Sequence, residues 1–258
     1  MSSGSASFAA ALAVGVGVLV AASNAHAQGV DEFGGYGGPR VGRAESPQDA
    51  AVELRFGRYL PEVDNEFKGS ARPFHDVFGD SNRYELGAEV DWQVLRVPHL
   101  GTLGPGVGWG VTKFTAKAQF TNGSGESAED TRLWIMPMYL VGVARVDTLS
   151  RDLKIPFVPY AKLGLGLGVW WSSDGQQSAS AKGVAGKGLS YGLTYAAGLM
   201  FLLDVLDEDD AKSADGMTGI NNSYIFAEWF RPQLDGFGKS GVMDLSSSSW
   251  VLGIAMEM

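Results

Sequence analysis

The sequence predicts an all-β protein, an eight-stranded antiparallel up-and-down transmembrane β-barrel. Three observations support this fold class. Apolar and polar residues alternate with period two in many segments, the final residues Ser248–Met258 form one such segment, and no apolar run after Ala27 is long enough for a membrane-spanning helix. Strands that cross a bilayer must close into a barrel to satisfy their backbone groups, so the three observations together favour a barrel.

The C-terminal segment alternates up to the last residue of the chain. A soluble protein rarely ends on a bare amphipathic strand, because an open edge invites aggregation. A barrel instead pairs its last strand with its first, and lipid covers the apolar face. We therefore expect a C-terminal insertion strand whose lipid-facing side chains are Trp250, Leu252, Ile254, Met256 and Met258.

The composition narrows the classes of function. The 258-residue chain has 36 glycines, and only 19% of its residues are charged, below the roughly 25% usual for soluble domains. It has no cysteine, which excludes disulfides, thiolate metal sites and a cysteine nucleophile. A net charge of -9 argues against a nucleic-acid partner, which would require a basic surface. With three histidines in the chain, we expect neither a metal nor a cofactor.

The N-terminal region is typical of an exported protein. The apolar run Phe8–Ala22 is followed by the cleavage pattern Ala25-His26-Ala27, so we expect a signal peptide over residues 1–27. Met1–Ser7 carries no lysine or arginine, and the alternative is an uncleaved N-terminal anchor. Residues 28–48 are rich in glycine and proline and predict a flexible linker, with the barrel over residues 49–258.

The first half of the barrel contains four expected strands. The second strand alternates most clearly, with Tyr84 to Val94 apolar at every other position. In the third strand the alternation changes phase near Lys113, which either a β-bulge or a misassigned segment would explain. The fourth strand is apolar on both faces and its register stays open. The four strands are Ala51–Leu60, Tyr84–Val94, Val107–Phe120 and Arg132–Val146.

The second half contains four more expected strands. The fifth strand places Gly164, Gly166 and Gly168 on one face, which suits a narrow lumen with little room for side chains. The end of the sixth strand, Ala196–Leu203, is also compatible with a short buried helix. The seventh strand is barely long enough to cross a membrane. The four strands are Phe157–Trp171, Leu189–Leu203, Ser223–Arg231 and Ser248–Met258.

The connections between these strands predict the topology. With the N-terminus in the periplasm, the short turns lie on the inside and the polar loops on the outside. The expected outer loops are Pro61–Asn82, Thr121–Asp130, Ser172–Lys187 and Pro232–Ser247, and the expected inner turns are Pro98–Pro105, Asp147–Pro156 and Leu206–Asn222. The last turn is long for its side, and its acidic run Asp207–Asp210 is better explained as solvated charge than as a calcium loop.

Three segments carry a resemblance to a known family. They are Phe157–Gly166 (FVPYAKLGLG), Tyr224–Trp229 (YIFAEW) and the terminal strand. Over residues 51–258 the chain resembles the small outer-membrane β-barrels of the OmpA and OmpW type, and most of all a poorly characterised branch from myxobacteria. The resemblance implies the outer membrane of a Gram-negative-type envelope, contact with outer-membrane lipid and, during insertion, with the barrel-assembly machinery. Barrels of this kind usually end in an aromatic residue, whereas this chain ends in Met258.

Charged residues fall on the inward face of several expected strands. A small barrel has a lumen barely wide enough for side chains, so buried charges there must pair with each other. We expect a salt-bridged plug centred on Arg55 and Lys162, and the alternative is a narrow ion path. The expected lumen charge network consists of Glu53, Arg55, Glu85, Glu89, Asp91, Lys162 and Glu228.

Aromatic residues lie near the ends of the expected strands. Amphipathic rings at both interfaces are typical of membrane barrels, so we interpret these residues as an aromatic girdle. The alternative is ordinary core packing in a secreted soluble sandwich or barrel. The expected girdle consists of Tyr59, Tyr84, Trp109, Phe120, Trp134, Trp171, Tyr191, Trp229 and Trp250.

The sequence favours a structural or interaction protein of the cell envelope and not an enzyme. Its outer loops are the expected contact surface for envelope components or other cells. A lipid-modifying hydrolase would need a rigid nucleophile and base, and the only candidates are Ser70, His75 and Asp76 in the first outer loop. A channel for ions or small solutes is the other alternative.

Overall fold

The computed structural model describes residues 50–67, 69–79, 83–119, 126–174, 177–178, 180–181, 184–205 and 220–258. The chain divides into two units, Met1–Ala44 and Glu45–Met258, and every described residue belongs to the second unit. The expected signal peptide (residues 1–27), the linker (residues 28–48) and most of the acidic inner turn therefore lie outside the described residues.

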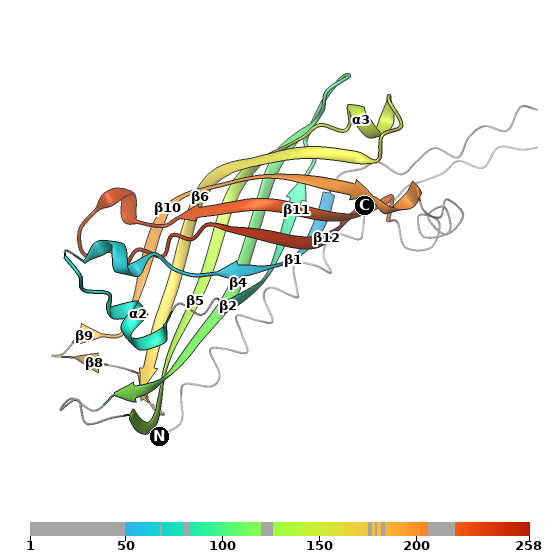
Figure 1. Ribbon diagram of the computed structural model, residues 1–258. Helices are drawn as coiled ribbons and strands as arrows, with labels where there is room; N and C mark the ends of the chain where they lie inside the picture. The colour runs from blue at the N-terminus through green and yellow to red at the C-terminus, as the bar shows by residue number, and fades with distance from the viewer. Residues whose placement is uncertain are drawn as a thin grey trace, which may run out of the picture. The chain divides into compact units, whose positions relative to one another are not determined.

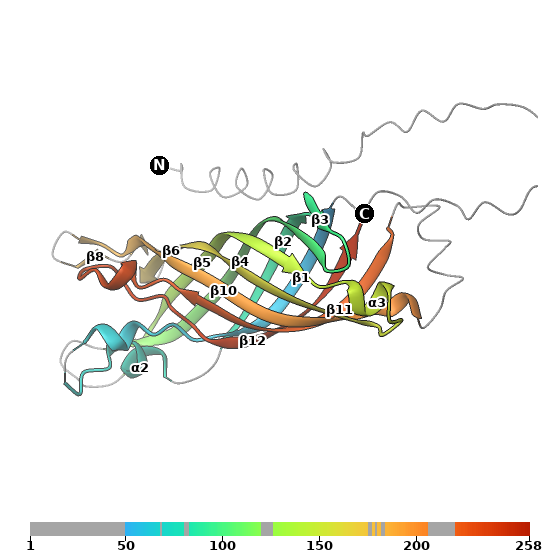
Figure 2. The same cartoon turned by 90° about the horizontal axis from the view of Figure 1, so that it is seen from above.

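Eight long antiparallel strands form a closed up-and-down barrel, as the sequence predicts (Figures 1 and 2). Each strand pairs with the next along the chain, and the last pairs with the first. The strands are β1 (Ala50–Tyr59), β2 (Arg83–Trp92), β4 (Gly101–Gln119), β5 (Glu126–Arg145), β6 (Phe157–Asp174), β10 (Lys187–Leu202), β11 (Asn222–Gln233) and β12 (Ser249–Glu257).

The closing seam joins β1 to β12 in a continuous antiparallel register. Ala51 lies opposite Glu257, and the pairing continues to Gly57 opposite Val251. The backbone groups of Ala50 and Met258 also bond to each other, at 3.1 and 2.9 Å. The terminal strand therefore has partners on both sides, and its edge is not open to aggregation.

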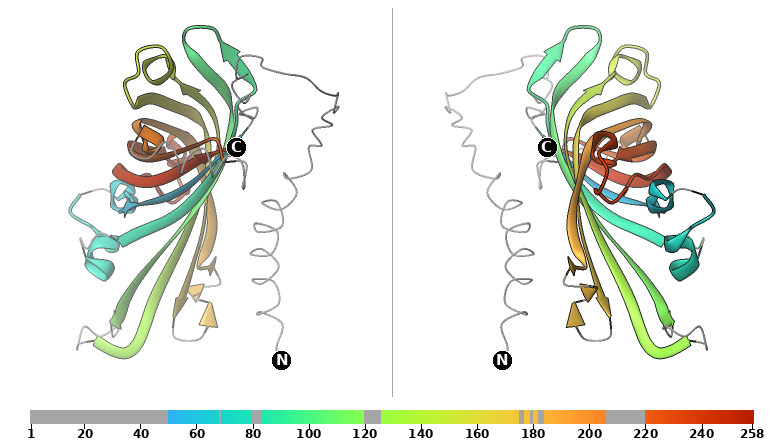
Figure 3. Two further views of the ribbon diagram at one scale, coloured as in Figure 1. Left: turned by 90° about the vertical axis from the view of Figure 1, so that its right-hand side faces the viewer. Right: turned by 90° about the vertical axis from the view of Figure 1, so that its left-hand side faces the viewer.

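Shorter elements lie at the two ends of the barrel. One end, which we call the loop end, carries η1 (Val63–Glu66), α2 (Pro73–Phe78), β7 (Gln177–Ser178), β8 (Ser180–Ala181), β9 (Val184–Ala185) and η3 (Gly236–Gly238). The opposite end, which we call the terminal end, carries Ala50 and Met258 together with β3 (Leu95–Val97), α3 (Thr148–Arg151) and η2 (Leu203–Val205) (Figure 3). Among the described residues, no helix is long and apolar enough to cross a membrane.

The expected turn Pro98–Pro105 is wrong in its extent. Strand β4 already begins at Gly101, and it forms a tight hairpin with β3, in which Val97 lies opposite Gly101. The glycines that suggest a turn mark a close approach of two backbones instead. A Cβ atom on Gly104 would overlap the carbonyl oxygen of Trp92 at the end of β2.

The β-bulge expected near Lys113 is also wrong. Alternation continues through this part of β4, with Thr112 and Phe114 buried and Lys113 exposed between them. The apparent phase change arises because the outer face becomes polar near the loop end, whereas the inner face becomes apolar there. The register shift that does occur lies between Lys117 and Gln119.

Three other uncertainties about the strands are resolved. Strand β5 turns Leu133, Ile135 and Tyr139 inward, so its apolar inner face explains why both faces look alike in the sequence. The end of the sixth expected strand is strand up to Leu202 and not a helix. The seventh expected strand, β11, has 12 residues and is long enough to cross a membrane.

The outer face of the barrel is apolar around its whole circumference. Leu163 is 64% exposed and Leu252 is 58% exposed, which is unusual for leucine in water. Every barrel strand contributes at least one large exposed apolar side chain, for example Leu54, Leu86, Val107, Leu140, Leu165, Leu199, Ile225 and Leu252.

The inside of the barrel holds two apolar clusters. The first cluster lines the wall formed by β5, β6, β10, β11 and β12, and it includes Tyr139, Tyr160, Met200, Phe226 and Phe230. The second cluster fills the loop end, and it consists of Tyr59, Val63, Phe74, Phe114, Leu133, Ile135, Leu234 and Leu245. Since its members come from β1, η1, α2, β4, β5 and the β11–β12 loop, the loops are part of the core.

Two of the inward glycines of β6 make room for the β11–β12 loop. A Cβ atom on Gly166 would lie 2.7 Å from Leu234 and would also overlap the Thr194 hydroxyl. A Cβ atom on Gly168 would lie 2.7 Å from Leu245. Both leucines are fully buried, so the missing side chains of β6 are replaced by the side chains of the loop.

Substitution Gly166→Ala tests this fit. We expect it to lower the free energy of unfolding by about 1–3 kcal/mol, because the new methyl group overpacks the contact with Leu234 and Thr194. Urea unfolding of the barrel in detergent micelles measures the change. Gly142→Ala is the matched control, since the nearest atom to its Cβ would be the Leu163 oxygen at 3.8 Å. Equal effects of the two substitutions would contradict the packing argument.

Candidate functional site

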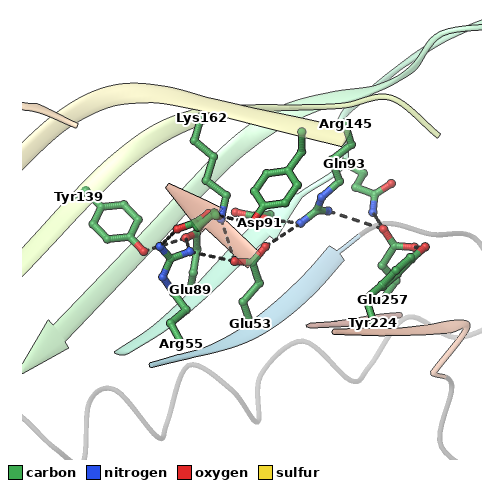
Figure 4. Close-up of polar contacts among 12 residues, drawn as sticks. Glu53, Arg55, Glu89, Asp91, Gln93, Tyr139, Arg145, Lys162, Tyr224 and Glu257 are labelled. Carbon is green, nitrogen blue, oxygen red and sulfur yellow. Dashed lines mark hydrogen bonds and ion pairs between the residues drawn. The ribbon is translucent and has the colours of Figure 1, made fainter. Parts of the chain in front are cut away.

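Charged residues from four strands meet inside the barrel around Arg55 (Figure 4). The guanidinium of Arg55 donates to Glu89 at 2.8 Å and to Glu53 at 3.0 Å, and its second nitrogen donates to Glu228. All four side chains are buried, with Glu53, Glu89 and Glu228 fully inaccessible. Strands β1, β2 and β11 place them there because these residues share the inward face that alternates with the apolar outer face.

Lys162 of β6 joins the same group of carboxylates from the opposite wall. Its ammonium lies 2.7 Å from Glu53, 2.9 Å from Glu89 and 3.6 Å from Glu228. Each of these carboxylates therefore forms ion pairs with both Arg55 and Lys162. Shared partners of this kind tie opposite walls of the barrel together, and removing one of them would leave a buried charge unpaired.

The network extends toward the terminal end through Arg145 of β5, which the sequence reasoning missed. Its guanidinium lies 2.6 Å from Asp91, 3.1 Å from Glu53 and 3.7 Å from Glu257. Because the alternation left the register of the expected fourth strand open, it did not show on which face of that strand Arg145 lies. Arg145 is an even number of residues from Leu133 and Tyr139, so all three side chains lie on the same, inward face of the strand.

Glu257 of β12 is the second member that the sequence reasoning missed. Its carboxylate accepts hydrogen bonds from Gln93 at 2.7 Å, from Asn222 at 3.0 Å and from Tyr224 at 2.9 Å. Glu257 stands on the polar face of the insertion strand, opposite the apolar face that attracts notice. It links the closing seam to the network.

Tyrosine hydroxyls and aromatic faces complete the coordination of the charges. Tyr139 donates to Glu89 at 2.7 Å, and Tyr160 donates to Glu228 at 2.8 Å. The Arg55 guanidinium also lies 4.9 Å from the centre of the Phe230 ring, a cation–π distance. Aromatic walls exclude water from the ion pairs, which strengthens each pair and raises the cost of breaking it.

Glu85 does not join this network, although the sequence places it there. It points inward from β2, but its Oε2 atom has no hydrogen-bond partner within the described part of the chain. It lies near the loop end, where its other oxygen packs against Gly110. Strand β2 carries Glu89 and Asp91 into the ion-paired group, whereas Glu85 faces a small cavity that Arg55 also lines and forms no ion pair among the described residues.

Three carboxylates of the network lie close enough to hold a metal ion. Ligand oxygens of Glu53, Glu89 and Asp91 all fall within 4.8 Å of one another. Arg145 and Lys162, however, already place their cationic groups on these carboxylates. The cluster is therefore better described as a hub of ion pairs than as a metal centre.

The second apolar cluster covers the network from the loop end. The Tyr59 hydroxyl donates to the carbonyl of Leu245 at 2.5 Å, and the Ser190 hydroxyl donates to the carbonyl of Met243 at 2.6 Å. Arg231 of β11 forms an ion pair with Glu62, next to η1. These bonds hold the β11–β12 loop and η1 in the opening of the barrel.

A polar cavity of about 320 Å³ opens at the terminal end. Its lining includes Arg145, Glu257, Arg151 and Lys154, and the buried ion pairs form its floor. Asp204 of η2 stands nearby, where burial raises the pKa of its carboxyl group while the backbone N–H of Ser223 donates to it at 3.1 Å. The cavity ends at the network and does not reach the loop end.

Most residues of the expected girdle lie on the outer face, but the assignment of Tyr59 to the girdle is wrong. Tyr84 and Trp250 are strongly exposed, and Trp134 stacks on Trp171 with ring centres 6.0 Å apart. Trp109, Tyr191 and Trp229 also face outward, whereas Phe120 lies outside the described residues. Tyr59 is only 2% exposed and points into the second apolar cluster. It has the same parity as Glu53 and Arg55, so the alternation itself assigns it inward.

The residues of the insertion strand face outward together. Trp250, Leu252, Ile254 and Met258 are exposed and Met256 is partly exposed, while Val251, Ala255 and Glu257 between them are buried.

The hydrolase candidates lie on the loop-end surface. His75 and Asp76 are neighbours on α2, with 3.4 Å between the His75 Nδ1 atom and the carboxylate, and both are solvent exposed. Ser70 belongs to an exposed turn before the helix.

Fold and site define a closed eight-stranded barrel with an apolar exterior and buried ion pairs in its interior. No family model matches the chain, and no curated protein matches it. Among solved structures, Ail, the attachment invasion locus protein of Yersinia pestis, is 15% identical over 83% of this chain and 100% of that one, with a TM-score of 0.42. The N-terminal β-barrel domain of Pseudomonas aeruginosa OprF is 12% identical over 82% and 98%, with a TM-score of 0.37. Neither comparison supports the myxobacterial branch.

Substitution Arg145→Met tests the importance of the network. We expect a loss of about 3–5 kcal/mol in the free energy of unfolding, because the buried carboxylates of Asp91 and Glu257 would lose their cationic partner. Urea titration followed by tryptophan fluorescence measures it. Arg151→Met is the control, since this arginine is exposed and its one ion pair among the described residues is with Asp147 at 3.6 Å. A small effect at Arg145, similar to that at Arg151, would show that the network contributes little.

Proposed function

We propose that the chain is an integral outer-membrane barrel with a structural or interaction role at the cell envelope, and that it is not an enzyme. One observation carries the proposal, namely the continuous belt of exposed apolar side chains on all eight strands. Water would not tolerate such a belt on a monomer, whereas hydrocarbon covers it at no cost. We place the loop end at the outer side of the membrane and the terminal end in the periplasm.

The boundaries of the belt support the same placement. Toward the loop end, the outward residues change from apolar to basic at Arg58 on β1, Lys113 on β4, Arg132 on β5 and Lys187 on β10. Aromatic residues Tyr84, Trp134, Trp171 and Trp250 stand at this boundary, where amphipathic rings favour the headgroup region. The contacting lipid would thus be outer-membrane lipid, and the insertion strand would be the part read by the barrel-assembly machinery.

The lumen in this proposal is a plug and not a pathway. Ion pairs span it from β1 to β6, and the second apolar cluster lies between them and the outer side. An ion entering from the terminal cavity would have to displace Lys162 or Arg145 from paired carboxylates. The loop end would then supply the function, through exposed side chains such as Phe67, Val77 and Phe237 that are available to envelope or surface partners.

Substitution Leu165→Lys tests membrane insertion. Leu165 is exposed near the middle of the belt on β6, so a lysine there should destabilise the inserted barrel by about 2–4 kcal/mol. Heat-dependent gel mobility of the outer-membrane fraction detects the folded barrel, and urea unfolding from lipid vesicles measures its stability. Ser173→Lys, beyond the belt on the same face, is the control. A barrel that dissolves without detergent and tolerates both lysines would refute the proposal.

Planar-bilayer recording tests the plug. We expect the purified, inserted barrel to give no stepwise conductance at neutral pH, because the ion pairs and the apolar cluster fill the lumen in series. A porin reconstituted in the same way provides the positive control. Reproducible current steps from the wild-type barrel would favour the alternative function as a narrow channel.

A further inference from the structure

A row of four residues crosses the outer face of the barrel at the boundary of the apolar belt nearest the loop end. Lys113 of β4 lies opposite Trp134 of β5, Trp134 lies opposite Trp171 of β6, and Trp171 lies opposite Lys187 of β10. Two stacked indoles therefore stand between two lysines, on four adjacent strands. We call this row the Lys–Trp–Trp–Lys ladder.

The geometry of the ladder is well defined. The indole planes of Trp134 and Trp171 are 7° from parallel with their centres 6.0 Å apart, and the Lys113 ammonium lies 5.0 Å from the Trp134 ring centre. Neighbouring strands are spaced about 4.8 Å apart, so the backbones of the two lysines are separated by about 14 Å. The ladder thus presents an apolar platform with a cation at each end.

The rows above and below the ladder show where it lies relative to lipid. On the side of the terminal end, the next outward row is Met136, Val169 and Leu189, which is entirely apolar. On the side of the loop end, the next outward row is Thr115, Arg132 and Ser173, which is entirely polar. The ladder is therefore the last row before the belt ends, at the level expected for lipid headgroups.

The two lysines of the ladder have no carboxylate partner among the described residues. The nearby carboxylate of Asp130 lies 2.8 Å from Lys117 and 3.5 Å from Arg132. Neither Lys113 nor Lys187 forms an ion pair with any residue that the structure describes. In a protein with a net charge of -9, two lysines without a carboxylate partner among the described residues favour an anionic ligand.

We propose that the ladder binds a glycolipid of the outer leaflet whose disaccharide headgroup carries a phosphate at each end. The lysines bind one phosphate each, and the indoles pack against the sugar rings between them. Flat sugar faces pack well on aromatic rings, and a headgroup with two separated phosphates matches two separated cations better than a lipid with a single phosphate. The inference rests on the proposed outer-membrane insertion.

Native mass spectrometry of the barrel in detergent micelles tests this inference, with lipid A as the probe. Each lysine near a headgroup contributes enough to change affinity about fivefold. We expect Lys113→Gln with Lys187→Gln to weaken lipid A binding roughly thirtyfold. The control is Lys154→Gln with Lys239→Gln, which removes the same charge from the terminal end of the barrel and from the β11–β12 loop. The control pair should change affinity less than twofold.

Three comparison ligands decide between sources of the phosphate. We expect lipid A to bind more tightly than its monophosphoryl form, and both more tightly than phosphatidylglycerol, while inorganic phosphate should not compete at millimolar concentration. Equal binding of all anionic lipids, full competition by inorganic phosphate, or equal loss in the control pair would each overturn the inference. Heat-dependent gel mobility of every variant separates these results from failure of the proposed function, because a chain that never inserts would lack the folded, heat-sensitive band.

Discussion

The charges that meet at the centre of this barrel must find their partners inside it. Closure of β1 on β12 seals the wall, the apolar belt covers the outside, and the second apolar cluster covers the loop end. Arg55, Lys162 and Arg145 therefore bridge carboxylates from opposite walls. Buried ion pairs rarely add net stability over apolar packing, but they penalise wrong registers strongly. A one-residue slip of β1 would turn Arg55 into lipid and remove one of the two cations that pair with Glu89.

Much of the fold could be predicted because lipid outside and a narrow lumen inside impose the same two-residue period on every strand. The number of strands, the closure and the faces of β2, β6 and β12 follow from that period alone. Prediction failed where one face changes character along a strand. At Phe114 the interior becomes apolar while Lys113 becomes polar outside, so an unbroken strand resembles a bulge.

The site could be predicted only in part, for a related reason. Alternation identifies which charges point inward, and it groups Glu53, Arg55, Glu89, Asp91, Lys162 and Glu228, which do meet in space. Alternation says nothing of position along a tilted strand, so it includes Glu85, which forms no ion pair with the other charges among the described residues. It omits Arg145 because both faces of β5 are apolar. The cross-strand ladder depends on the register of four strands, which no single segment contains.

The seating of Leu234 and Leu245 on the side-chain-free positions of β6 makes one surface loop part of the interior. Surface loops of barrels are common places to display foreign epitopes, because they usually diverge without disturbing the wall. The β11–β12 connection is unsuitable as such a display position. An epitope inserted between the two leucines would remove their side chains from the lumen. In natural variants, this loop and the β6 glycines should therefore change together.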